Sequence, residues 1–186
     1  MGLLDLIRER REELVDRWVG LVLGTYPPQA VAFLQKERDG FRNPVGATIR
    51  RAIGELVAGL LADADAGDLA APLEAVVRMR AVQNFSPAQA VGFVFLFRRA
   101  LREVLNDELR EARAGELLDV DARLDGMALR AWDSYAASRE KVSDIRAREA
   151  TARTYALLKR AGFLADATDA VETADIGTCS RVEGRS

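Results

Sequence analysis

The sequence has no histidine, a single cysteine among its 186 residues, and no surplus of positive charge. Without histidine, the chain cannot form a His-activated nucleophile, a His-containing zinc or non-haem iron site, or a globin-type proximal haem ligand. The lone Cys179 permits no intramolecular disulfide or thiolate cluster, which fits a reducing compartment. The chain has 27 basic and 29 acidic residues, so it has no excess positive charge to neutralise phosphates. We therefore expect no nucleic-acid partner.

Long apolar runs and targeting signals are also absent. No uninterrupted apolar run approaches the roughly 20 residues that a membrane helix needs, so we expect no membrane insertion. The N-terminal residues place arginines and acids after a short apolar stretch, which is unlike a signal peptide. We therefore expect a cytoplasmic protein. With 49% apolar residues, a chain of this length is able to bury a proper core of one domain.

Helical periodicity, prolines and capping residues predict an all-α fold class, a bundle of about six to seven helices with a long C-terminal helix. Apolar residues recur at helical spacing over 3–23, until Pro27 and Pro28 end the pattern. Asn43 followed by Pro44 and, farther on, Asp68 are expected to cap two more helices. The predicted helices span 3–23, 30–37, 44–61, 69–83, 87–105 and 116–160.

The strongest helix start is the capping box formed by Ser86, Pro87, Ala88 and Gln89. Residues 90–97 are rich in valine and phenylalanine, and by composition alone they could form a buried strand. Because the box directly precedes them and the helical period continues to Leu105, we predict one continuous helix. Its first two turns are apolar all round, which places it at the centre of the domain.

The long helix over 116–160 carries a 4,3 spacing that resembles a coiled-coil seam. This seam contains Leu124, Ala128, Ala131, Tyr135, Val142 and Ile145. The first four can pack against the core or a second chain, whereas the last two lie too far along the helix for a small core to cover them. The seam favours a homodimer, although it could equally be one face of a bundle helix. We predict one domain over 1–162 and a flexible acidic tail over 163–186.

Few residues suggest chemistry. The sequence has no Gly-rich phosphate loop and no metal-ligand spacing, so we predict no catalytic, cofactor-binding or metal residues, no haem, and no enzyme. For Arg78 and Arg80, a helix-packing salt bridge is favoured over an anion site. For Trp132 and Tyr135, core packing is favoured over a ligand cage.

Two stretches, Phe41–Gly46 and Val77–Phe93, resemble the N-terminal sensor domain of RsbR-type stressosome proteins, the RsbT co-antagonist family. The resembling positions are Asn43, Pro44, Arg78, Arg80, Gln83, Phe85, Ser86, Pro87 and Gln89. The resemblance covers roughly residues 5 to 110 well and the long helix more loosely. It implies a globin-like fold without haem, used as an input module and dimerising through its terminal helices.

In that family, the domain usually precedes a phosphorylatable STAS domain. Here 26 residues follow Arg160, too few for a STAS domain, so we expect a stand-alone relative. The leading hypothesis is a non-catalytic sensory module, paired as a homodimer and read by a protein partner that is unknown. The alternative is a structural accessory subunit or adaptor that docks onto a larger complex.

Overall fold

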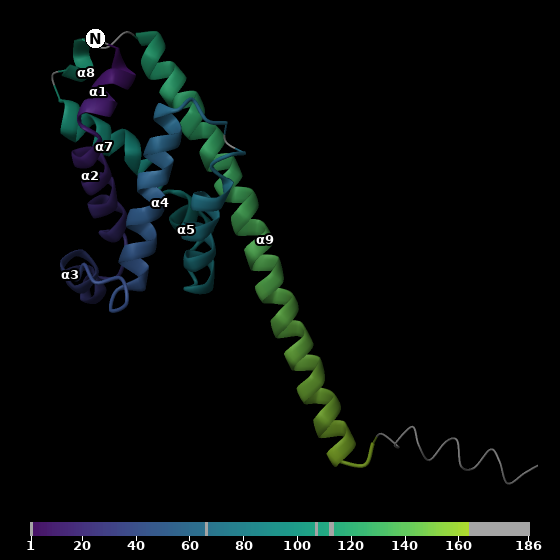
Figure 1. Ribbon diagram of the computed structural model, residues 1–186. Coiled ribbons are helices and arrows are strands. Elements are labelled where there is room, and N and C mark those ends of the chain that lie inside the picture. The colour runs from purple at the N-terminus through teal and green to yellow at the C-terminus, as the bar shows by residue number, and fades with distance from the viewer. Residues whose placement is uncertain (1, 66, 107, 112–113, 164–186) are drawn as a thin grey trace, which may run out of the picture. The chain divides into compact units, whose positions relative to one another are not determined.

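The computed structural model describes residues 2–65, 67–106, 108–111 and 114–163 (Figure 1). It is 79% helical, and these ranges contain no strand. The all-α class is therefore confirmed, together with the long C-terminal helix. The globin-like arrangement stays a prediction. Cys179 and all of the predicted tail except its first residue lie outside the described residues.

Seven of the helices have seven or more residues, in agreement with the expected number, and α6 and α8 are shorter. The helices are α1 (Leu3–Glu9), α2 (Arg11–Leu23), α3 (Pro28–Lys36), α4 (Pro44–Leu61), α5 (Ala70–Val82), α6 (Pro87–Val91), α7 (Leu96–Leu105), α8 (Glu108–Glu111) and α9 (Ala114–Arg160). The chain forms two compact units, and the first ends at Val142.

The prediction of a single N-terminal helix over 3–23 is wrong, because the chain turns at Arg10 between α1 and α2. The turn falls in the run from Arg8 to Glu13, where six consecutive charged residues interrupt the apolar pattern. Apolar residues on both sides of it are buried, among them Ile7 and Leu14. A bend in the charged run lets each helix bury its own apolar face.

The predicted continuous helix over 87–105 is also wrong, although the rejection of a strand there is confirmed. It divides into α6 and α7, joined by a turn over residues 92–95, and the amides of Val94 and Leu96 donate to carbonyls three residues earlier. The Phe93 carbonyl accepts from the Leu96 amide at 3.2 Å and also from the Trp18 indole at 2.8 Å. Phe95 is 42% exposed, so the apolar run is not buried on all sides.

Asn43 caps α4 as predicted, and its side chain is buried. Its oxygen accepts from the Gly46 amide at 2.8 Å, while its amide group donates to the carbonyls of Leu34 and Glu37, both at 2.9 Å. A Cβ on Gly46 would lie 2.3 Å from the Asn43 amide nitrogen, so this cap requires glycine. The expected Asp68 cap is absent: α5 starts after Leu69, without a side-chain cap.

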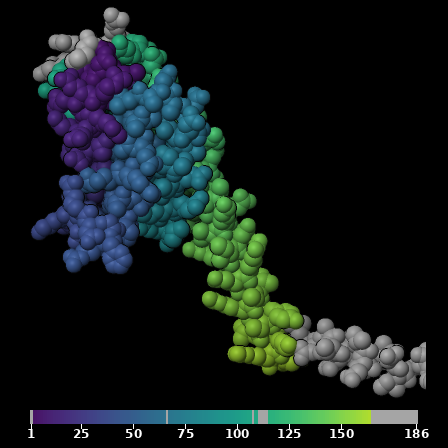
Figure 2. Space-filling model, in the orientation of Figure 1, coloured from purple at the N-terminus to yellow at the C-terminus, as the bar shows by residue number. Residues whose placement is uncertain are grey.

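Within the first unit, α2 contacts α4 and α7, and α4 also contacts α5. Figure 1 shows α2, α4 and α5 side by side, and their side chains close into a continuous surface in the space-filling view (Figure 2). The aromatic centre of the core is Trp18, whose ring lies 5.0 Å from that of Phe97 and 6.5 Å from that of Phe93. These contacts hold the turn between α6 and α7 against α2.

Candidate functional site

The most unusual side chain of the first unit is Arg80 on α5, which is 0% exposed. Its Nη1 donates to the Gln89 carbonyl at 2.7 Å, and its Nη2 donates to the Val22 carbonyl at 3.2 Å and to the Thr25 hydroxyl at 2.9 Å. Val22 lies in the last turn of α2, where the helix dipole favours a cation. Among the described residues, no carboxylate pairs with this guanidinium.

Three aromatic rings surround the same guanidinium. The Cζ of Arg80 lies 5.1 Å from the ring centroid of Phe85, 5.4 Å from that of Tyr26 and 5.6 Å from that of Phe93. Each ring presents partial negative charge on its face, which attracts a desolvated cation. We call Arg80 with these three rings the Arg80 cage. Its charge is balanced by carbonyls, a hydroxyl and ring faces.

Burial shifts the titration of both polar groups of the cage. Loss of hydration lowers the pKa of Arg80 and raises the pKa of the Tyr26 hydroxyl, a rise that the nearby Arg80 charge opposes. The Arg80 Nε and the Tyr26 hydroxyl are buried without a hydrogen-bond partner in the part of the chain that the structure describes.

Phe85 links the cage to the long helix. Its ring is part of the cage and meets the Tyr26 ring edge-on, with 5.1 Å between the centroids. Its amide donates to the Arg80 carbonyl at 3.1 Å, and its carbonyl accepts from the hydroxyl of Tyr135 on α9 at 2.9 Å. One residue of the α5–α6 loop is therefore bound on one side to the cage and on the other to α9.

The structure divides the predicted motif residues into separate groups. Arg80 and Phe85 belong to the cage, and the Gln89 carbonyl accepts from Arg80. The capping box at the start of α6 is confirmed: the Ser86 hydroxyl accepts from the Gln89 amide at 3.3 Å, and the Gln89 side chain accepts from the Ser86 amide at 3.0 Å. The box therefore positions a carbonyl that Arg80 uses.

The remaining motif residues lie elsewhere. Arg78 is exposed and pairs with Glu74 at 3.1 Å along α5. Gln83 ends α5, and Pro87 is the first residue of α6. The start of α4, with Asn43 and Pro44, forms its own buried cap.

Sequence reasoning missed four residues that complete the site: Val22, Thr25, Tyr26 and Phe93. Val22 and Thr25 precede Arg80 by 58 and 55 positions, so no local periodicity connects them with it. The one local sign was the odd placement of an arginine between the apolar residues of α5.

The seam residues of α9 fall into two groups. The four that precede Val142 are buried within this chain, which is one of the two arrangements that the sequence left open: Leu124, Ala128, Ala131 and Tyr135. Val142 is half-buried, and Ile145 is 56% exposed. Self-association through the seam stays a prediction. Trp132 is 51% exposed, so core packing was the wrong expectation for it, whereas Tyr135 is a core residue.

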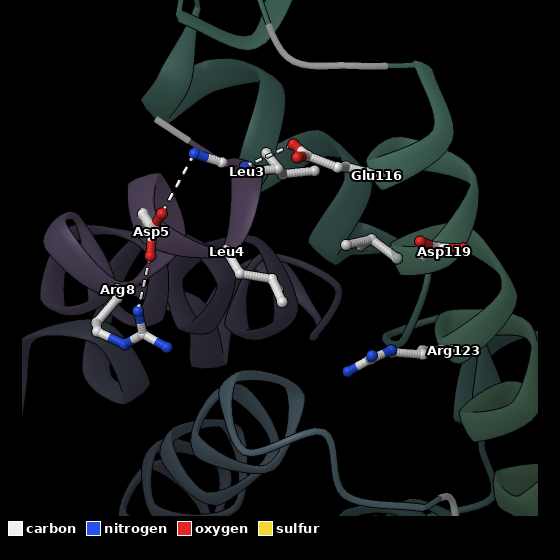
Figure 3. A pocket seen from close by; sticks show the side chains of 9 residues that line it. Leu3, Leu4, Asp5, Arg8, Glu116, Asp119 and Arg123 are labelled. Atoms are coloured by element: carbon white, nitrogen blue, oxygen red, sulfur yellow. Dashed lines mark hydrogen bonds and ion pairs between the residues drawn. The ribbon is translucent and has the colours of Figure 1, made fainter.

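A pocket of about 350 Å³ lies between α1 and the start of α9 (Figure 3). Leu4 from α1 and Arg123 from α9 point into it from opposite sides. Most of its polar groups already serve the fold. The Glu116 carboxylate accepts from the Leu3 amide at 2.7 Å, Asp5 accepts from Arg8 at 2.9 Å, and Arg123 donates to the Leu60 carbonyl at 3.0 Å. This pocket marks the docking of α1 on α9.

The described ranges contain no group of three or more acidic or thiol side chains placed to hold a metal ion. No described helix is both long enough and apolar enough to cross a membrane. The fold and the Arg80 cage define an all-α domain in which a buried cation connects α2, α5 and α6 beside a long helix.

The chain belongs to the family described as the RsbT co-antagonist protein rsbRD N-terminal domain, whose model matches residues 12–150. The match includes the whole Arg80 cage and α9 to beyond Tyr135. The family points to a signalling input domain of the stressosome type. Comparison with curated proteins and with solved structures found no match.

Proposed function

We propose that this chain is a non-catalytic signal-input domain in which the core sets the state of α9. The observation that carries the proposal is the bond between Tyr135 of α9 and Phe85, whose ring belongs to the Arg80 cage. Phe85 of the α5–α6 loop thereby contacts both the buried Arg80 and the long helix α9. Membership of a family of signalling input domains supports the same assignment.

The non-catalytic part of the proposal rests on how the polar groups are used. An active site needs a titratable group with a perturbed pKa that faces a cavity. The most perturbed buried groups described are Arg80 and Tyr26, and neither lines the pocket beside α1. Glu103 and Arg98 have shifted pKa values because they form ion pairs at the surface. We propose that the domain works without haem, metal or other cofactor.

We also propose that the working form is a homodimer assembled through α9. Large apolar side chains of this helix that are exposed in the single chain are Leu118, Leu129, Trp132, Ile145, Tyr155, Leu157 and Leu158. Large apolar residues gain roughly 1.5–3 kcal/mol each when they are fully removed from water. A second copy is the simplest partner, because identical helices are complementary about a two-fold axis.

The alternative function is an adaptor that docks on a larger complex, and the same exposed residues favour it. Native mass spectrometry of protein purified from its own host separates the two. A signal-input domain should appear as a dimer whose mass shows no haem or metal. A stable one-to-one complex with an enzyme subunit would instead establish the adaptor, and a stoichiometric haem would overturn the cofactor-free proposal.

A further inference from the structure

Phe85 is held from two sides, and only one of them involves its side chain. The ring lies over Arg80 and against Tyr26, while the backbone carbonyl receives the Tyr135 hydroxyl of α9. Because the amide of Phe85 is also bonded to the Arg80 carbonyl, both the ring and the N–H of this residue follow Arg80. The position of the Phe85 carbonyl therefore depends on the cage, although the described hydrogen bonds of Arg80 go to Gln89, Val22 and Thr25 and not to α9.

Tyr135 lies where the burial of α9 ends. It is the last residue of this helix that is buried in the first unit, and the side chains from 136 to 142 are half-buried or exposed. Among the described residues, the other polar bonds from α9 to the rest of this unit involve Glu116, Asp121, Arg123 and Asp125, all near the start of the helix. Over 126–142, the described contacts include one side-chain hydrogen bond to another element, that of Tyr135.

The apolar packing of α9 beside this bond comes from Met127, Ala128, Ala131 and the ring of Tyr135. Ala128 and Ala131 bury one methyl group each, which contributes far less than a leucine at the same depth. Large buried side chains such as Met127 contribute about 1.5–3 kcal/mol each, and a hydrogen bond adds about 0.5–1.5 kcal/mol net to this packing. The loss of one bond would therefore change how firmly this part of α9 is held.

The loop that carries Phe85 has backbone strain. Asn84 adopts a φ of +61°, in the left-handed region, which asparagine tolerates better than most residues but which still costs energy. The loop is kept in this conformation by the Phe85 contacts on one side and by the Ser86–Gln89 capping box on the other. Releasing the Phe85 ring would remove one of these two constraints.

Resting on the proposed function, we propose that Phe85 is the residue through which the Arg80 cage controls α9. When the cage is intact, it holds the Phe85 carbonyl within hydrogen-bond distance of the Tyr135 hydroxyl, and α9 stays packed on the core as far as Tyr135. When the cage is disturbed, the loop relaxes, the bond opens, and the helix is released over residues 131–142.

Amide hydrogen exchange of the full chain, followed by mass spectrometry, tests this assignment. Phe85→Leu removes the ring but keeps the carbonyl, and Tyr135→Phe removes only the hydroxyl. Each should raise exchange in peptides covering 131–142 by roughly 2- to 10-fold, the factor expected for one hydrogen bond, with little change in α2 and α4. Tyr155→Phe, at an exposed position of the same helix, is the matched control and should change nothing.

The double variant supplies the decisive result. If both changes act through one bond, Phe85→Leu combined with Tyr135→Phe should raise exchange no more than the larger single change does. The assignment would be overturned if the two increases in exchange rate multiplied in the double variant. It would also be overturned if the 131–142 peptides of Phe85→Leu exchanged as in the wild type.

Should Phe85→Leu fail to fold, Tyr26→Leu removes a ring contact with Phe85 without altering the loop, and it should produce the same local change. An unchanged 131–142 region in that variant would count against the proposal.

Failure of the Phe85 assignment can be distinguished from failure of the proposed signal-input function. Exchange is measured on the isolated chain without any signal, so its failure would remove Phe85 as the coupling residue and leave the signal-input proposal to native mass spectrometry. Conversely, an enzyme-bound adaptor could still show the exchange pattern.

Discussion

Two stretches of the same helix, residues 114–142 and 143–160, differ sharply in burial. The first buries Val120, Leu124 and Met127 and forms ion pairs with Arg98 of α7 through Asp121 and Asp125. In the second, all described side chains are exposed. Both stretches are rich in alanine and arginine, which favour helix. Local propensity therefore accounts for helix formation along the whole length, but it does not decide where the helix is packed.

The hydrogen bonds show the same contrast. In the first stretch, Arg123 donates to the Leu60 carbonyl of α4, and Tyr135 donates to the Phe85 carbonyl. In the second, the hydroxyls of Thr151 and Thr154 donate to carbonyls four residues earlier in their own helix. Such bonds add nothing to tertiary structure. The first stretch contributes to the stability of the domain, and the second is available for a partner.

The largest difference between the stretches should come from a matched pair of leucines. Leu124→Ala, at a position that is 0% exposed, should lower the free energy of unfolding by about 2–5 kcal/mol, because it removes buried methyl groups and leaves a cavity. Leu157→Ala, at a position that is 64% exposed, should change it by less than about 0.5 kcal/mol. Urea denaturation measures both. Equal losses would mean that the second stretch is packed in solution.

The dimer proposal predicts an effect on association without an effect on folding. Val142→Asp combined with Ile145→Asp places two charges at the boundary of the stretches and should convert a dimer into a folded monomer. Light scattering and circular dichroism together check this result. A dimer that survives would place the contact elsewhere, and Leu129→Asp with Trp132→Asp then tests the other exposed face. A monomeric wild type would favour the adaptor function.

The capping box should contribute to stability, although α6 has only five residues. Ser86→Ala removes the acceptor of the Gln89 amide and should cost about 0.5–2 kcal/mol. Ser143→Ala, at an exposed position inside α9, is the control and should be neutral or slightly stabilising, since alanine is the better helix former. An unchanged denaturation midpoint for Ser86→Ala would show that the box contributes nothing in solution.

The smallest predicted effect concerns acid stability. Hydrogen bonds from Arg17 of α2 and Arg99 of α7 lower the pKa of Glu103 to about 2. Since the pKa is lower in the folded state, the contribution is complete above the unfolded value near 4.5 and is lost as the pH falls toward 2. Glu103→Gln should therefore flatten the loss of stability between those values. Urea midpoints at several pH values test this, and an identical pH profile would exclude the contribution.

Arginines show how far the sequence could be interpreted. Arg78 and Arg80 look alike in the sequence, where a helix-packing salt bridge was the favoured expectation. Arg78 does pair with Glu74, one helical turn away, as local spacing allows. Arg80 instead lies beside the Val22 carbonyl of α2, the ring of Tyr26 just after α2, and the ring of Phe93 in the turn after α6. Local helical spacing was sufficient to predict the partner of Arg78, but it could not predict the partners of Arg80.

By itself, the sequence determined the all-α class, the caps at Asn43 and Ser86, the family and the extent of the long helix. Caps, prolines and helical periodicity act between residues a few positions apart, so they can be recognised without a fold. Only the tertiary structure decided the break of the central helix at residues 92–95, the burial of Arg80 and the face of α9 that packs on the core. These depend on the Trp18 bond to Phe93 and on the Val22 carbonyl, 58 positions from Arg80, since a buried polar group must find its partners wherever the packed elements provide them.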